Sequence, residues 1–275
     1  MDYLPIAERL LASAGFATNL PGFLVLFGLA LARVLMAVYL APFFGGQSVP
    51  GRVRVGMAVI FTIVLLPNLQ PPPAFTISPL VFVALLAKEA LTGAMLGMVC
   101  QFVFYGIQMA GVLIDTQRGM NQLTFFAPQL AGPASVLGQL KLQLAIAVFL
   151  LAGGHLLFLR ALDTTFRQLP LLAFPRIGDG AAFLDTMARL SANAFVTALQ
   201  LAAPVMLALL LIDVCFGVLG RIASQIQAHQ ESQPVKALAG LGVFLLSTGF
   251  LLDRIVAQLG AMVQNVQQVV ALLKP

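Results

Sequence analysis

Long apolar segments, separated by short polar or proline-rich ones, dominate the pattern of this chain. Residues 10–32, 55–87, 90–114 and 190–212 contain no Asp, Glu, Lys or Arg. A helix needs about 20 predominantly apolar residues to cross the hydrocarbon core of a bilayer. The pattern therefore predicts an all-α, polytopic membrane protein of about six long hydrophobic helices arranged in helical hairpins.

Proline and glycine positions set the expected ends of these helices. The predicted hydrophobic helices cover 21–41, 52–66, 79–115, 138–159, about 190–220 and about 234–251. The third is too long for a perpendicular span, so it is tilted, broken near its middle or continued outside the hydrocarbon layer. We expect Pro204 and Asp213 to interrupt the fifth. Two amphipathic helices, 1–18 and 252–273, complete the pattern.

Two pairs of small residues lie inside the long third segment. Gly93 and Gly97 are four residues apart, and Gly106 and Ala110 repeat the spacing. Small residues at this spacing let two helix backbones approach closely where lipid supplies no hydrophobic driving force. We therefore expect other helices to pack tightly against this one.

Composition supports the membrane assignment and narrows the function. Of the residues, 60% are hydrophobic and only 9% charged, whereas soluble domains carry about a quarter charged residues. The net charge of +5 is spread thinly, which argues against nucleic-acid binding. Lys and Arg divide nearly equally between the two sets of connections, so charge counting does not set the orientation.

No catalytic or metal-binding pattern stands out. Cys100 and Cys215 are interpreted as small buried side chains, and His155 has no second ligand at metal spacing. His229 lies in a polar segment and is expected to be solvated. The sequence contains no nucleophile elbow, zinc-protease motif or phosphate-binding loop. We therefore predict no enzymatic activity, cofactor or metal.

Four charged residues lie within apolar stretches: Arg33, Lys88, Glu89 and Asp213. Such charges usually pair, face a cavity or contact a partner. Mutual pairing between helices is the favoured interpretation, ahead of contact with another membrane subunit and a proton relay. Lys88 and Glu89 project about 100° apart on a helix, so they are not expected simply to neutralise one another. At least one of them needs a partner elsewhere.

The segment 111–138 combines charges, amides, two adjacent phenylalanines and several helix breakers. Its irregular backbone cannot face lipid, because its unpaired N–H and C=O groups would find no partner there. It is therefore either an external connection or a loop enclosed by protein. Within it, we infer that Asp115 and Arg118 pair at the base of the loop.

Several sequence blocks in the same order resemble the FliR/SctT family of type III secretion export gates. The first block is ARVLMAVYLAPFFGGQSVPGRVRVGMA at 32–58, and the second is Lys88-Glu89 followed by Gly93 and Gly97. IDTQRG at 114–119, Pro128 and SVLGQL at 135–140 form the third. The last comprises Pro204, Asp213, Gly217, Arg221, Gln225, Pro234 and Lys236. The Asp-x-Gln-Arg-Gly form and the Gly153-Gly154 pair look more like the injectisome branch, SctT, than the flagellar one, FliR.

The resemblance implies one subunit of a helical, hetero-oligomeric, protein-conducting pore in the bacterial inner membrane. The implied partners are FliP/SctR-like and FliQ/SctS-like membrane subunits, a FlhB/SctU-like switch protein and unfolded secreted proteins. The chain would form a single export-gate domain, 1–275, with an N-terminal helical part, 1–190, and a C-terminal helical hairpin, 191–275. Its plug loop, within 116–137, would close the pore.

Two sets of site residues follow. The plug and pore residues are Gly119, Met120, Asn121, Gln122, Leu123, Thr124, Phe125, Phe126, Ala127 and Pro128. The intramembrane or subunit-contact charges are Arg33, Arg54, Lys88, Glu89, Asp115, Arg118, Asp213, Arg221 and Lys236. Met, Leu and Phe suit an apolar seal because they are bulky and, for Met, adaptable.

One block departs from the family pattern, and other functions stay open. Between Arg221 and Lys236 an apolar, Phe-rich turn is usual, but this chain has Ser224, Gln227 and AHQESQ at 228–233. The partner contact made by that turn in relatives is therefore in doubt here. A secondary transporter of a small solute is the alternative function, although no internal repeat supports it. A membrane enzyme is a third alternative, without any recognisable site.

Overall fold

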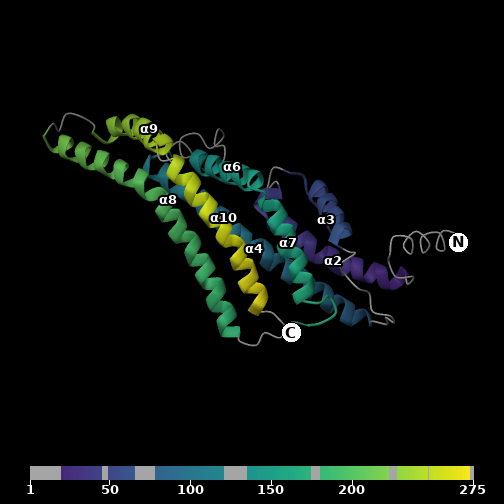
Figure 1. Ribbon diagram of the computed structural model, residues 1–275. Helices are drawn as coiled ribbons and strands as arrows, with labels where there is room; N and C mark the ends of the chain where they lie inside the picture. Colours follow the sequence, from purple (N-terminus) through teal and green to yellow (C-terminus); the bar gives the residue numbers. More distant parts are fainter. Residues whose placement is uncertain are drawn as a thin grey trace. The chain divides into compact units, whose positions relative to one another are not determined.

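The computed structural model is helical wherever it has regular secondary structure. It describes residues 20–44, 49–65, 78–120, 135–174, 180–222, 228–246 and 248–272. In order, the helices are α2 (Leu20–Leu40), η1 (Pro42–Phe44), α3 (Gly51–Leu65), α4 (Pro79–Gln117), α6 (Val136–Leu151), α7 (Gly154–Gln168), α8 (Gly180–Ile222), α9 (Ala228–Leu246) and α10 (Thr248–Leu272) (Figure 1). The all-α prediction is confirmed.

Three described helices are long and apolar enough to cross a membrane. They are Gly22–Leu40, Pro79–Gln117 and Gly180–Ile222, and a fourth span results if α6 and α7 count as one broken span. The helix α3 has only 15 residues, and α9 has Glu231 in its first turn. The membrane character is therefore supported, whereas the number of about six spans stays a prediction.

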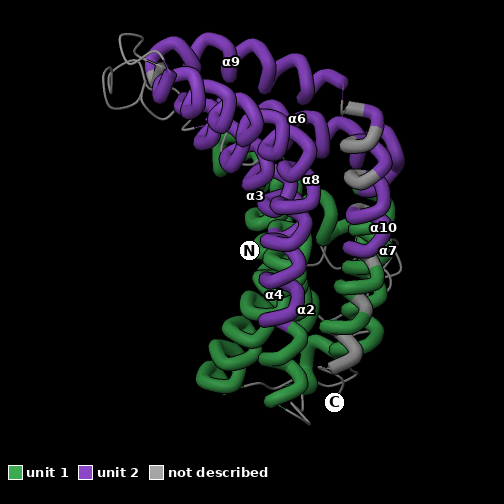
Figure 2. Tube along the Cα trace, turned by 90° about the vertical axis from the view of Figure 1, so that its left-hand side faces the viewer, with its two compact units in different colours: residues 1–101, 155–186, 263–275 green, residues 102–154, 187–262 purple. Residues whose placement is uncertain are grey.

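The chain forms two compact units (Figure 2). Unit 1 comprises residues 1–101, 155–186 and 263–275, and unit 2 comprises residues 102–154 and 187–262. Each unit combines segments far apart in sequence, and the long helices α4 and α8 contribute to both. The division of the chain into 1–190 and 191–275, expected from the sequence, stays a prediction.

In unit 1, α2 and α3 pack together, and aromatic rings fill the space beside the break that follows α2. Phe43 meets Phe158 of α7 edge-on with ring centroids 5.1 Å apart, and Phe44 lies 5.3 Å from Phe61 of α3. Pairs of this geometry add to the stability gained from apolar burial. The break at Pro42 is thus anchored by aromatic packing.

In unit 2, α4, α6 and α8 share an apolar core. Phe104 of α4 meets Phe149 of α6 edge-on at 5.5 Å, and Leu201, Ala202 and Val205 of α8 are fully or almost fully buried. A Cβ at Gly106 would approach within 2.8 Å of the backbone carbonyl oxygen of Ala194. The small residue at 106 therefore lets α4 and α8 pack backbone to backbone, as the spacing predicts.

Several helix ends differ from the sequence prediction. The range 138–159 was predicted as one helix, but it is broken at Ala152 and Gly153, where Gly153 has φ +73°. Neither Pro204 nor Asp213 interrupts α8, which runs through both. The polar segment AHQESQ, 228–233, is part of α9, and α9 and α10 divide the predicted range 234–251. Cys215 is exposed, so its interpretation as a buried side chain is wrong.

Candidate functional site

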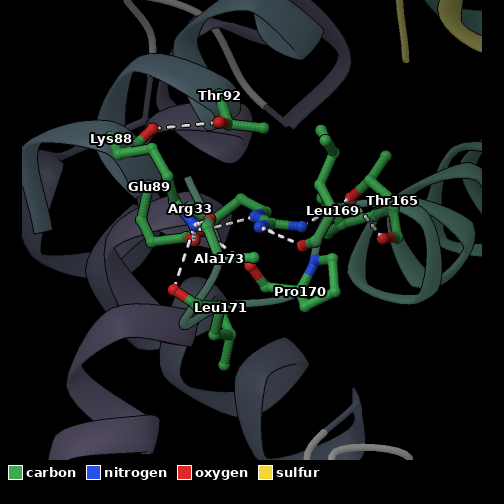
Figure 3. Close-up of polar contacts among 10 residues, drawn as sticks. Arg33, Lys88, Glu89, Thr92, Thr165, Leu169, Pro170, Leu171 and Ala173 are labelled. Carbon is green, nitrogen blue, oxygen red and sulfur yellow. Dashed lines mark hydrogen bonds and ion pairs between the residues drawn. The ribbon is translucent and has the colours of Figure 1, made fainter. Parts of the chain in front are cut away.

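The first candidate site is a buried charge cluster in unit 1, formed by Arg33, Lys88 and Glu89. The Arg33 Nε donates a hydrogen bond to Glu89 Oε2 at 2.5 Å, and both side chains are fully buried (Figure 3). Lys88 forms an ion pair with the other carboxylate oxygen of Glu89. One carboxylate thus lies between two cations from α2 and α4. The expectation that these charges pair within the chain is confirmed.

The remaining donors of the cluster are satisfied by the end of α7 and the segment after it. Arg33 Nη1 donates to Thr165 Oγ1 at 3.3 Å, and Nη2 donates to the Leu169 carbonyl at 2.8 Å. Lys88 Nζ donates to the carbonyls of Pro170, Leu171 and Ala173 at 2.9–3.1 Å. Because buried charges are costly unless paired and hydrogen-bonded, this arrangement fixes α7 and its exit against α2 and α4.

The guanidinium of Arg33 also has an aromatic neighbour. Its central carbon lies 4.4 Å from the ring centroid of Phe166, a distance typical of a cation–π contact. The cluster contains no nucleophile and no general base with a free approach. Its chemistry is that of a structural tie between three helices, and not that of a catalytic site.

Two glycines make the cluster possible. A Cβ at Gly93 would collide with the backbone carbonyl of Arg33, and a Cβ at Gly97 would meet the Ala37 carbonyl oxygen at 3.1 Å. The two helices α2 and α4 therefore touch along their backbones, as the small-residue spacing predicts. This contact brings Arg33 within reach of Glu89, 56 positions later in the chain.

The second candidate site is the loop base in unit 2, defined as residues 115–120 and 135–138. The buried Asp115 carboxylate accepts two hydrogen bonds on Oδ2: from Ser135 Oγ at 2.8 Å and from the backbone N–H of Leu137 at 2.9 Å. Ser135 is the N-cap of α6, and its Oγ accepts from the Gly138 N–H at 2.8 Å. A carboxylate at a helix N-terminus also interacts favourably with the helix dipole. Asp115 therefore joins the end of α4 to the start of α6.

Arg118 extends the loop base to α9. Its Nη1 lies 3.2 Å from Asp115 Oδ1, and its Nη2 donates to the Ala237 carbonyl at 2.8 Å. A Cβ at Gly240 would come within 2.8 Å of Arg118 Cδ, so the side chain lies directly on the glycine surface of α9. The pairing of Asp115 with Arg118 inferred from the sequence is present.

The turn at Gly119 ends α4 in a defined way. The Gly119 N–H bonds to the Thr116 carbonyl and the Met120 N–H to the Asp115 carbonyl, both at 3.1 Å, with Gly119 at φ +76°. This is the Schellman arrangement, in which glycine takes the left-handed position that other residues adopt with strain. A Cβ at Gly119 would collide with the side-chain amide of Gln233. Part of the unusual AHQESQ segment thus contacts the loop base within the chain itself.

The other predicted site residues divide into three groups. Arg54 donates to the Val49 carbonyl and lies 4.8 Å from the Tyr39 ring centroid, so it secures the start of α3. Lys236 of α9 forms an ion pair with Asp213 of α8, and Arg221 is exposed. The predicted plug residues Asn121, Gln122, Leu123, Thr124, Phe125, Phe126, Ala127 and Pro128 lie outside the described residues.

One sequence expectation about the cluster is wrong. Lys88 and Glu89 do form an ion pair, although adjacent helix positions project about 100° apart. Their side chains are long enough to turn toward each other beyond the Cβ atoms. The second half of the expectation is confirmed, because Glu89 also binds Arg33 and Lys88 also binds three carbonyls.

Sequence reasoning missed some participants and undervalued others. Ser135 carried a readable signal, since serine before an apolar run is a typical N-cap. Lys141 is 1% exposed in α6, with its Nζ 5.6 Å from the Phe244 ring centroid, and a lone lysine in an apolar segment deserved the same interpretation as Lys88. Backbone acceptors such as Leu169 and Ala237 have no sequence signal. Within the described residues, no three His, Cys, Asp or Glu side chains gather as a metal site.

Comparison with known proteins identifies the family. A family model described as bacterial export proteins, family 1, matches residues 24–262. The flagellar biosynthetic protein FliR of Pectobacterium carotovorum is 33% identical over 211 residues, which are 76% of this chain and 78% of that protein. The residues matched by the family model, 24–262, therefore include both the charge cluster and the loop base.

Two further relatives match over similar lengths. The Yop proteins translocation protein T of Yersinia pestis is 25% identical over 79% of this chain and 84% of its own length. The surface presentation of antigens protein SpaR of Salmonella typhimurium is 26% identical over 79% and 80%, respectively. The chain therefore belongs to family 1 of the bacterial export proteins, the FliR/SctT family, and is a non-enzymatic membrane component of the type III export apparatus.

Proposed function

We propose that this chain contributes one subunit and a pore-closing loop, residues 119–128, to an inner-membrane channel for unfolded secreted proteins. Family membership supports a role in the export apparatus. The pore-closing role of the loop is supported by the sequence resemblance and by the structure of the loop base. The observation that carries the proposal is the Asp115 carboxylate, which lies at one end of the intervening segment and binds Ser135 and Leu137 at the other.

A pore-closing loop needs fixed ends and an apolar, deformable middle. Asp115, Ser135 and the glycine turn at Gly119 supply the fixed ends. Met120, Leu123, Phe125 and Phe126 supply bulky apolar side chains, and the neighbouring amides supply backbone partners. Such a loop blocks ions by filling the pore with side chains that bind neither water nor ions strongly. It also yields to a passing polypeptide without breaking covalent structure.

The exposed apolar surface fits membrane insertion and assembly with other subunits. Leu207, Leu211 and Val214 of α8 are 56–66% exposed in the isolated chain. An apolar surface of this extent needs lipid or partner helices. The proposed partners are FliP/SctR-like and FliQ/SctS-like membrane subunits and a FlhB/SctU-like switch protein, in a multi-pass, inner-membrane complex.

The branch of the family is part of the proposal. The Asp115-Thr116-Gln117-Arg118-Gly119 form and the Gly153-Gly154 pair favour the injectisome branch. Both a flagellar biosynthetic protein and a translocation protein match the chain, so the comparisons are compatible with either branch. Restoration of secretion in an injectisome strain that lacks its own subunit, without restoration of motility in a flagellar mutant, would support the branch assignment.

Gentle extraction tests the assembly. The tagged chain is purified from its native membrane in mild detergent, and its size and companions are measured by native mass spectrometry. The proposal predicts one copy of this chain with several copies of two smaller hydrophobic proteins. A monomer or homodimer that catalyses solute uptake after reconstitution would instead support the transporter alternative.

A further inference from the structure

Arg118 connects the loop base to α9. Asp115 accepts from two α6 groups on Oδ2 and faces Arg118 with Oδ1. Arg118 in turn donates to the Ala237 carbonyl of α9. A single guanidinium thus joins the carboxylate of the loop base to the backbone of another helix. All these residues belong to unit 2.

From this geometry, we propose that Arg118 is a positioning residue through which α9 holds the loop base. The inference deepens the proposed function, on which it rests for its effect on pore closure. When α9 keeps its place, Ala237 and Gly240 hold the guanidinium against Asp115. When α9 shifts, Arg118 loses either the Ala237 carbonyl or the Asp115 carboxylate. The ends of α4 and α6 then separate more easily.

Arg118 is tightly enclosed where it meets α9. The Arg118 side chain is 10% exposed, and its Nε has no hydrogen-bond partner in the described part of the chain. Its aliphatic stem lies on Gly240, where any larger side chain would occupy the same space. Gln233, about two turns before Gly240 on α9, lies against Gly119. The helix α9 therefore contacts the loop base through Gln233, the Ala237 carbonyl and Gly240.

Two glycines of α9 provide a matched pair of variants. A Cβ at Gly240 would press on Arg118 Cδ, whereas a Cβ at Gly242 has nothing within 4 Å. Gly240→Ala and Gly242→Ala gain the same helix propensity. Only Gly240→Ala displaces Arg118, and it does so without removing a charge. Any difference between the two variants therefore reports on the Arg118 contact and not on helix stability.

The direct readout is hydrogen–deuterium exchange of the loop-base amides in the intact gate complex. The Gly119, Met120, Leu137 and Gly138 N–H groups are hydrogen-bonded within the loop base. We expect Gly240→Ala to raise their exchange about tenfold over Gly242→Ala, because a charge-assisted hydrogen bond is weakened. Equal exchange in the two variants overturns the inference.

A double-mutant cycle shows whether the effect passes through Arg118. In an Arg118→Ala background, the Cβ added at Gly240 no longer meets the Arg118 side chain, so Gly240→Ala and Gly242→Ala should give equal exchange. Arg118→Lys keeps a charge near Asp115 but cannot reach both acceptors, and should resemble Gly240→Ala. An undiminished effect of Gly240→Ala in the Arg118→Ala background contradicts the inference.

Ion conductance of the reconstituted gate separates this inference from the proposed function. Both together predict greater leakage for Gly240→Ala than for Gly242→Ala. Faster exchange in Gly240→Ala without leakage supports the role of Arg118 in holding the loop base, and counts against a pore-closing role for the loop. Equal exchange, combined with leakage on disruption of Phe125 and Phe126, counts against the Arg118 inference and retains the pore-closing loop.

Discussion

Arg33 on α2 donates its Nε hydrogen bond to Glu89 on α4 at 2.5 Å, with both side chains fully buried. The pair is possible because Gly93, one helical turn beyond Glu89, lets the α2 backbone lie against α4. It also organises the exit of α7, since the remaining donors of Arg33 bind Thr165 and Leu169. A charge pair thus determines how three helices of unit 1 meet.

Removal of the Glu89 charge should strongly destabilise unit 1. Glu89→Gln leaves Arg33 and Lys88 buried without a counter-charge, and breaking a buried pair in this way costs about 3–5 kcal/mol. Thermal unfolding of the purified complex in mild detergent measures the loss. Arg167→Gln is the control, because the Arg167–Asp163 pair is largely exposed and contributes about 1 kcal/mol or less. Equal effects of the two substitutions would argue against the cluster as a structural tie.

Gly93→Ala should separate α2 from α4. The added Cβ collides with the backbone carbonyl of Arg33, which cannot move aside like a flexible side chain. Overpacking of this kind costs about 1–3 kcal/mol. Gly56→Ala on α3 is the matched control, since nothing lies within 4 Å of its Cβ and alanine raises helix propensity. A stability of Gly93→Ala equal to that of Gly56→Ala, measured by thermal unfolding, would contradict the close backbone contact.

The helical class and most helices were predictable because apolar length is a strong signal. The positions of the helix breaks were harder to predict. Gly153 lies in a continuous apolar run, and a lone glycine does not reveal a φ of +73°. Pro204 suggested an interruption, yet α8 continues through it because tertiary packing around Leu201 and Val205 outweighs the local penalty. The AHQESQ segment looked like a turn, although Ala, Gln and Glu all favour helix.

The charged side chains of the candidate site could be predicted from the sequence, but the backbone carbonyls that accept their hydrogen bonds could not. Arg33, Glu89 and Lys88 stood out because charges are rare in apolar segments. The carbonyls of Leu169, Pro170 and Ala173 become acceptors only through the path of the chain after α7, which no side-chain pattern encodes. The same holds for Ala237, whose carbonyl binds Arg118. The charged donors could thus be predicted from the sequence, whereas their backbone acceptors are determined by the tertiary structure.

Gly119→Ala should cost more than Gly153→Ala. Both glycines have positive φ, so both substitutions strain the backbone by about 1–2 kcal/mol. Only the Cβ at Gly119 also meets Gln233, whereas the space at Gly153 is open. Thermal unfolding of both variants, alone and combined with Gln233→Ala, isolates this contact. The difference between them should shrink with Gln233→Ala; a difference that persists would rule out the Gln233 contact as its source.

Ser135→Ala should loosen the start of α6. The substitution removes the N-cap acceptor for Gly138 and one of the two donors to Asp115 Oδ2. Loss of a serine cap costs about 1 kcal/mol, and threonine retains most of the function. Hydrogen exchange at the Leu137 and Gly138 amides should rise in Ser135→Ala and stay near the wild-type value in Ser135→Thr. Unchanged exchange in Ser135→Ala would exclude the cap as a support of the loop base.

Residues 119–128 are proposed to close a protein-conducting pore, and single-channel conductance of the reconstituted gate complex tests this most directly. The double substitution Phe125→Gly and Phe126→Gly should raise ion leakage well above wild type, because it removes the bulk of the seal. Phe125→Leu and Phe126→Leu, which keep apolar bulk, should leave the channel closed. Wild-type conductance in the glycine variant, within a fully assembled complex, would contradict the claim.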